Sequence, residues 1–97
     1  MRTSKDYIDL LKSQALHLQT KYKMGSMYMF GSVARDEHSE GSDVDLFVDM
    51  PGQFYLASEA NDYLEDILGC HVDLVRNHSN LTPFFRKQIL DYGIRIF

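Results

Sequence analysis

The chain has few of the features that define several other protein classes. It has one cysteine, Cys70, and therefore cannot form a disulfide within itself. No apolar run approaches the roughly 18 residues that a membrane span needs, and the first residues follow an amphipathic pattern instead of that of a signal peptide. We expect a protein of a reducing cytoplasm that makes no contact with a membrane.

Positive charge is also scarce. Lysine and arginine number 10 against 14 aspartate and glutamate residues, which gives a net charge of −4 and a pI of about 5.4. Such a surface repels a duplex or a long RNA on average, so no long nucleic acid is expected as a partner. A chain of 97 residues suffices for one domain, residues 1–97, and we expect no second domain that would hold a substrate.

The hydrophobic pattern predicts helices that alternate with strands. Thr3 and Asp6 have the spacing of a capping box, and apolar residues then recur at helical steps as far as Tyr22. This stripe predicts one helix of about five turns. A second helix is predicted over 53–68, with Gly69 as its left-handed C-terminal cap.

Three short strands are predicted at 27–30, 43–49 and 71–75. Because a helix and short turns join the second strand to the third, a right-handed crossover should make these two parallel in one sheet. A last helix is predicted to begin at Thr82, and 94–97 can add a short edge strand. The predicted fold class is α/β, with a small mixed β-sheet flanked by helices.

The segment between the first two strands carries the strongest functional signal. Gly31 and Ser32 follow the first strand, ten residues intervene, and Asp43 and Asp45 open the second strand. Residues two apart on a strand project from the same face, about 6.5 to 7 Å apart at Cα, so both carboxylates can converge on the same cations. Oxygen ligands of this kind suit magnesium. Asp73 is expected beside them, because strand alternation places it on the same face.

These residues belong to two longer motifs, Gly-Ser-Val-Ala-Arg at 31–35 and Ser-Asp-Val-Asp-Leu at 42–46. Their layout closely resembles the signature of the minimal nucleotidyltransferase domains of the DNA polymerase β superfamily, and the resemblance runs along the whole chain. It implies the polymerase β-like nucleotidyltransferase fold and a transferase that uses ATP as substrate with Mg2+ in a two-metal site.

Size selects among the relatives, because larger nucleotidyltransferases use further domains to hold the acceptor of the nucleotide. In the stand-alone branch that this chain most resembles, the domain is the antitoxin of a two-component system. The resemblance implies that its partner is a HEPN-type ribonuclease toxin, with which it forms an oligomeric complex. The implied activity is transfer of AMP from ATP to a tyrosine hydroxyl of that toxin, which makes the domain a protein adenylyltransferase.

The resemblance also implies individual roles. Catalysis and metal binding fall to three carboxylates: Asp43, Asp45 and Asp73. Nucleotide binding falls to Gly31, Ser32 and Arg35, where glycine lets the backbone approach the phosphates and the start of the following helix presents free amides. Two readings of Arg35 remain open, since its guanidinium can pair with the triphosphate or with a carboxylate of the sheet.

Asp36 departs from the family pattern, which usually has a second glycine after that arginine. Its charge is expected either to weaken ATP binding or to lie in solvent. His38 is expected in a solvated loop with no catalytic role. Phe84 and Phe85 are adjacent on the last predicted helix and cannot both face the same side, so one of them is available for a partner interface.

Each motif has a simpler explanation when taken alone. An isolated Gly-Ser is nearly always a turn, and an isolated Asp-x-Asp is more often a strand entry than a metal site. Only their joint spacing favours a site. A haloacid-dehalogenase-type phosphatase is disfavoured, because its Asp-x-Asp follows a strand whereas this pair begins one. A second hypothesis is a non-catalytic binding module that neutralises or scaffolds its partner by contact, and Asp36 favours it.

Overall fold

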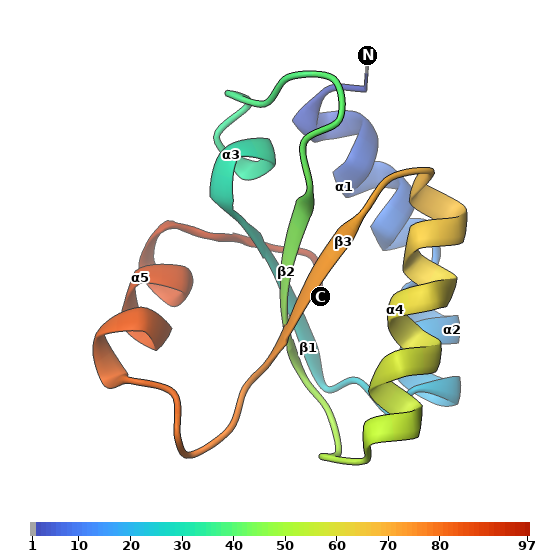
Figure 1. Cartoon of the computed structure of the whole chain (residues 1–97), viewed down its shortest axis with the longest axis vertical. Coiled ribbons are helices and arrows are strands. Elements are labelled where there is room, and N and C mark those ends of the chain that lie inside the picture. Colours follow the sequence, from blue (N-terminus) through green and yellow to red (C-terminus); the bar gives the residue numbers. More distant parts are fainter. Residues whose placement is uncertain (1) are drawn as a thin grey trace.

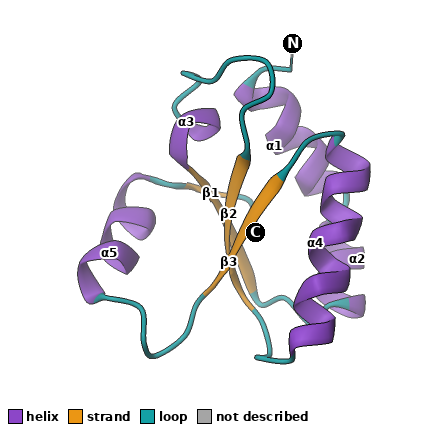
Figure 2. Cartoon of the chain, viewed as in Figure 1, coloured by secondary structure: helices purple, strands orange, loops and turns teal. Residues whose placement is uncertain are grey.

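Four strands form one mixed sheet in the computed structural model, which describes residues 2–97. The order β3-β2-β1-β4 comprises β1 (Ser26–Phe30), β2 (Val44–Asp49), β3 (Val72–Arg76) and β4 (Ile94–Arg95). β1 pairs antiparallel with β2 and with β4, whereas β2 and β3 are parallel. The predicted mixed sheet, its parallel crossover and its edge strand are confirmed, with strand ends that shift by one or two residues (Figures 1 and 2).

The helices of the described residues lie on both sides of this sheet. They are α1 (Ser4–Ser13), α2 (Ala15–Lys21), α3 (Gly31–Ala34), α4 (Phe54–Leu68) and α5 (Pro83–Tyr92). Figure 1 shows α1, α2 and α4 on one side and α5 on the other. Thr3 forms the expected capping box with Asp6, Gly69 ends α4 with a φ of 69°, and Thr82 caps α5. None of the helices within residues 2–97 is both long and apolar enough to cross a bilayer.

The single five-turn helix predicted at the start of the chain is wrong. The chain forms two helices that meet at Gln14, whose φ of −100° and ψ of 4° interrupt the regular α-helix. No glycine or proline marks this position, and the side chain of Gln14 instead accepts a hydrogen bond from the hydroxyl of Tyr63 on α4. The break therefore lies at a tertiary contact, while the predicted apolar stripe is kept, with Leu11 and Leu18 fully buried.

The main core lies between the sheet and the helices α1, α2 and α4. Its buried side chains include Leu11, Leu18, Leu46 and Leu64. Phe47 and Ile89 of α5 are also buried but lie outside this cluster. Phe47 lies two residues after Asp45 on β2 and therefore on the same face of the sheet. Its burial is explained by α5, which covers part of that face (Figure 1).

The loop between α3 and β2 is fastened to the start of α1. The backbone N–H of Ser4 donates to Oδ1 of Asp36 at 3.1 Å, and Nε2 of His38 donates to the carbonyl of Arg2 at 2.7 Å. The His38 ring also meets the ring of Tyr7 edge-on, with the centroids 6.1 Å apart. These contacts fix the loop that leads to Asp43.

Two expectations for this loop need correction. The side chain of His38 is only 4% exposed, so it is not solvated, because it packs between the loop and α1. Asp36 is 61% exposed, but its carboxylate caps α1 instead of lying free in solvent. Its φ of 57° lies in the left-handed region, which explains why glycine is usual at this position of the family motif.

Replacing Asp36 by alanine removes the hydrogen bond to Ser4 and puts alanine, which adopts the left-handed conformation less readily than aspartate, at this position. We expect the free energy of unfolding to fall by about 1 to 2 kcal/mol. Asp36→Gly loses the same hydrogen bond but relieves the backbone, so its change should stay within about 0.5 kcal/mol. Urea denaturation of the two variants checks this, and equal losses would contradict the left-handed assignment.

Candidate active site

Three side chains form a row across the sheet. Phe30 pairs with Asp45, and Asp45 pairs with Asp73, so the row crosses β1, β2 and β3. Residues opposite one another in neighbouring strands share a face, and the Cα atoms of Asp45 and Asp73 are about 4.8 Å apart by strand spacing. Asp43 lies one residue before β2 and is exposed. The structure thus brings the predicted carboxylates to the same end of the β2–β3 pair.

Gly31 lies directly against this row. It has a φ of 77°, and a Cβ added to it would overlap Oδ2 of Asp45. Two features therefore require glycine at position 31, namely the left-handed backbone conformation and the close approach of the Asp45 carboxylate. Ser32 follows in the four-residue helix α3 and is half-buried. The Gly-Ser pair is thus more than an isolated surface turn, because its glycine packs against the carboxylate of Asp45.

The carboxylates repel one another. The pKa of Asp45 is raised above its usual value, first by burial, then by the charge of Asp73 and then by that of Asp43, while Arg35 opposes the shift. No salt bridge within residues 2–97 neutralises any of the three carboxylates. A cation bound among them would relieve this repulsion.

The donor set fits a magnesium ion, since it consists of carboxylate oxygens that lack a cationic partner. Among residues 2–97, however, no group of three or more His, Cys, Asp or Glu side chains is already arranged to hold a metal ion. Asp45 and Asp73 are neighbours in the sheet, and the charges of Asp73 and Asp43 both raise the pKa of Asp45. The role of the three carboxylates as metal ligands stays a prediction.

Arg35 is not tied to the sheet. Its Nε lies 3.0 Å from Oε2 of Glu37, and both side chains are largely exposed, at 60% and 66%. An exposed pair of this kind contributes at most about 1 kcal/mol, so the guanidinium can leave it for a triphosphate. The structure therefore does not support the interpretation in which Arg35 pairs with a carboxylate of the sheet.

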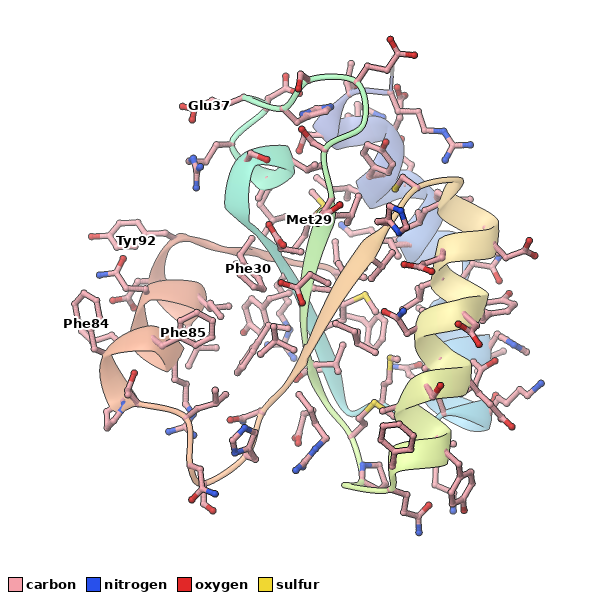
Figure 3. All side chains as sticks on the ribbon, in the orientation of Figure 1. Met29, Phe30, Glu37, Phe84, Phe85 and Tyr92 are labelled. Carbon is pink, nitrogen blue, oxygen red and sulfur yellow. The ribbon has the colours of Figure 1, made fainter. Side chains whose placement is uncertain are left out.

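Sequence reasoning missed the aromatic neighbours of the site. Phe30, the residue before the Gly-Ser pair, meets Phe85 of α5 edge-on, with the ring centroids 6.0 Å apart. Phe84 points away from the sheet and is 72% exposed (Figure 3). Because Phe84 and Phe85 are adjacent on a helix, their side chains were predicted to point in different directions. The position of α5 decides that Phe85 is the one that reaches the site.

Comparison with known proteins agrees with this geometry. The sequence profile of the nucleotidyltransferase domain matches residues 11–96. The protein adenylyltransferase MntA of Thermococcus cleftensis is 35% identical over 92 residues, which cover 93% of this chain and 92% of that protein. A provisionally named protein adenylyltransferase of Methanocaldococcus jannaschii is 36% identical over 91 residues, which cover 92% of this chain and 93% of that protein.

Solved structures have the same fold. A provisionally named minimal nucleotidyltransferase superposes with a TM-score of 0.75 at 30% identity, covering 96% of this chain and 95% of the other. A second match lies in the complex of the tri-AMPylated Shewanella oneidensis HEPN toxin with an MNT antitoxin. Its TM-score is 0.65 at 21% identity, over 93% of this chain and 71% of that one, and this likeness concerns the fold alone. The chain belongs to the nucleotidyltransferase domain family and is an enzyme of the nucleotidyltransferase class.

The contact between Gly31 and Asp45 can be tested with alanine. Gly31→Ala should lower the free energy of unfolding by about 1 to 2 kcal/mol for the left-handed backbone and by a further 1 to 3 kcal/mol, roughly, for the overlap with Asp45. Gly41 is the matched control, because its φ is 87° and an added Cβ would meet nothing within 4 Å.

Gly41→Ala should therefore show only the backbone cost. Adding Asp45→Ala to Gly31→Ala should recover most of the extra loss, which a double-mutant cycle in urea measures. Equal losses at positions 31 and 41, with no coupling to Asp45, would rule out the proposed contact.

Replacing Asp45 by asparagine should stabilise the protein in the absence of metal at neutral pH. A carboxyl group with a raised folded pKa stabilises folding fully below its unfolded value, near 3.8, and this contribution is lost as the pH rises through the folded value. At pH 7 the repulsion is present, and we expect Asp45→Asn to melt about 1 to 4 °C above the wild type.

The difference should shrink as the pH is lowered toward 4. Asp49→Asn is the control, because it removes the same charge from the exposed end of β2, four residues from Asp45. Melting curves followed by circular dichroism in chelator test this prediction. A lower melting temperature for Asp45→Asn at pH 7 would show that the carboxylate is not held among like charges.

Proposed function

We propose that this enzyme is a magnesium-dependent protein adenylyltransferase that transfers AMP from ATP to a tyrosine hydroxyl of a HEPN-type ribonuclease toxin. The observation that carries this proposal is the register pair of Asp45 and Asp73 beside the packed Gly31 turn. Relatives that match nearly the full chain are named protein adenylyltransferases, and a structure of the same fold is an MNT antitoxin bound to an AMPylated HEPN toxin.

The proposed reaction breaks a phosphoanhydride bond of ATP and forms a phosphoester bond to the tyrosine. The tyrosine oxygen attacks the α-phosphorus, a bond forms between them, and the bond from the α-phosphorus to the β-bridging oxygen breaks to release pyrophosphate. Asp73 helps to remove the hydroxyl proton, and Arg35 adds positive charge near the leaving phosphates. Mg2+ held by Asp43, Asp45 and Asp73 would stabilise charge on the attacking and leaving oxygens.

Modification would inactivate the toxin by local chemistry. AMP adds bulk and a negative phosphate beside the RNA-cleaving site, where the negative substrate must bind. The protein would thus act as an antitoxin. We place this reaction in the cytoplasm, where ATP is available and a protein with one free cysteine meets reducing conditions.

The second candidate function is a binding module that neutralises the toxin by contact without transferring AMP. The exposed apolar side chains of α5, Phe84 and Leu90, favour it, because a contact surface needs such groups. Asp36 no longer does so, since its carboxylate caps α1. Both candidates predict a complex with the toxin, and only the first predicts that the toxin gains mass.

Co-expression with the proposed HEPN-type toxin separates the two candidates. We expect intact-mass measurement to find the toxin heavier by one or more AMP units. The double variant Asp43→Asn/Asp45→Asn should lower transfer at least 100-fold, since it removes the groups that organise charge at the reacting phosphorus, yet it should still form the complex.

The matched control is Asp49→Asn, which removes one carboxylate from the same strand at a position outside the carboxylate row. It should modify the toxin at the wild-type rate. An unmodified toxin that is neutralised equally well by wild type and by Asp43→Asn/Asp45→Asn would falsify the catalytic proposal and leave the binding module.

A further inference from the structure

The outer edge of β3 carries backbone groups that no other strand uses. β3 ends the sheet on one side and pairs only with β2 among the strands of residues 2–97. At the start of the pairing the carbonyl of His71 accepts a hydrogen bond from the N–H of Val44, and at its end the N–H of Asn77 donates to the carbonyl of Val48. In a parallel pair every second residue bonds to the neighbouring strand, so the residues between these two alternate between β2 and the outer edge.

The outward-facing residues are Val72, Leu74 and Arg76. The N–H of Val72 donates to Oε2 of Glu65 on α4 at 3.0 Å, which confirms its direction and occupies the first outward group. Leu74 and Arg76 have no such partner for their backbone groups within the part of the chain that the structure describes. β3 also contains neither proline nor lysine, two residues that commonly block an edge strand. This edge is therefore a template for one more strand.

The carboxylate row runs up to this edge. Asp73 is its last member, after Phe30 and Asp45, and Asp73 is exposed. Because the backbone of Asp73 faces β2, an antiparallel strand added at the edge would have a non-hydrogen-bonded pair at this position, with Cα atoms about 4.5 Å apart. A side chain opposite Asp73 would then continue the row on the same face of the sheet.

We propose that an extended segment of the toxin pairs with this edge of β3 and presents the acceptor tyrosine opposite Asp73. This inference rests on the proposed function, in which the leaving phosphates lie toward Gly31 and Arg35 on the β1 side. In an in-line displacement the attacking oxygen comes from the opposite side of the α-phosphorus, which is the β3 side. A tyrosine side chain is longer than that of aspartate, so its hydroxyl can lean over Asp73 toward the phosphorus.

Charge argues against a second copy of this chain as the occupant. Two copies that paired through β3 would bring two rows of carboxylates side by side, in a protein with a net charge of −4. A tyrosine adds no charge opposite Asp73, and its hydroxyl gains from the neighbouring carboxylate, which accepts its proton in the proposed reaction.

Amide hydrogen exchange followed by NMR tests the pairing without any change to the chain. In the free protein the amides of Leu74 and Arg76 should exchange faster than those of Asp73 and Val75, which bond to β2. In the complex with the toxin, formed without ATP, the amides of Leu74 and Arg76 should slow at least about 10-fold more than the other two. Equal slowing at all four positions would contradict strand pairing, because general stabilisation does not alternate.

N-methylation of one edge residue tests the pairing through activity. Cys70 allows the full chain to be assembled by native chemical ligation of residues 1–69 to a synthetic segment of residues 70–97. N-methylation of Leu74, and separately of Arg76, removes one outward N–H, places a methyl group in the path of an added strand and keeps every side chain.

The matched control is N-methylation of Ser79 in the same synthetic segment. Ser79 is the second residue of a turn that is closed by the N–H of Leu81 and the carbonyl of His78. This turn position accepts proline, so a substituted nitrogen is tolerated there. Ser79 also lies beyond the end of β3.

We expect N-methylation of Leu74 or Arg76 to lower kcat/KM for AMP transfer to the toxin at least about 10-fold, from a lost hydrogen bond and a steric clash. The affinity for ATP with magnesium should stay within about twofold of the wild type, since the groups at Gly31 and Arg35 are untouched. N-methylation of Ser79 should change neither quantity.

Transfer at the wild-type rate by both edge variants would overturn the proposal, and so would a loss of ATP affinity as large as the loss of transfer. If sedimentation shows that the free protein dimerises and that N-methylation of Leu74 abolishes the dimer but not toxin binding, a second copy occupies the edge and the proposal is wrong. If the amides of Leu74 and Arg76 are protected in the complex but no AMP is transferred, docking of the toxin at this edge holds and the proposed function fails.

Discussion

The close packing of Gly31 on the carboxylate of Asp45 is the contact on which the site depends. It joins the end of β1 to the start of β2, and it is possible only because residue 31 lacks a side chain and adopts a positive φ. The same contact brings the Gly-Ser pair beside the carboxylates. The Gly-Ser pair and the Asp-x-Asp pair, which are ten residues apart in sequence, thereby lie side by side in the structure.

The two faces of the sheet have different tasks. One face is filled by side chains of α1, α2 and α4 and forms the main core. The other face is covered only in part by α5, so the row of Phe30, Asp45 and Asp73 stays accessible at one end. This division lets a small domain keep a continuous core and still hold three charges in one place, because the charges need not enter that core.

The loop between the two motifs shows how a family position can change its residue and keep its conformation. Aspartate tolerates the left-handed region better than most residues with a side chain, and here its carboxylate also caps a helix. Asp36 is therefore explained by local structure, and its charge is directed at α1. The buried ring of His38 fastens the same loop to Arg2, so the path of the chain toward Asp43 is fixed at two points.

The sequence alone predicted the four strands, the parallel crossover and the helix caps at Thr3, Gly69 and Thr82, because local periodicity, capping residues and connection lengths encode them. It also predicted that Asp45 and Asp73 lie side by side, and their role as metal ligands stays a prediction. Only the tertiary structure decided the break at Gln14, the partner of Arg35 and the choice of Phe85 over Phe84. Those features depend on contacts between segments that are remote in sequence or on the placement of a whole helix. A linear pattern specifies which face a residue occupies, and packing specifies what that face meets.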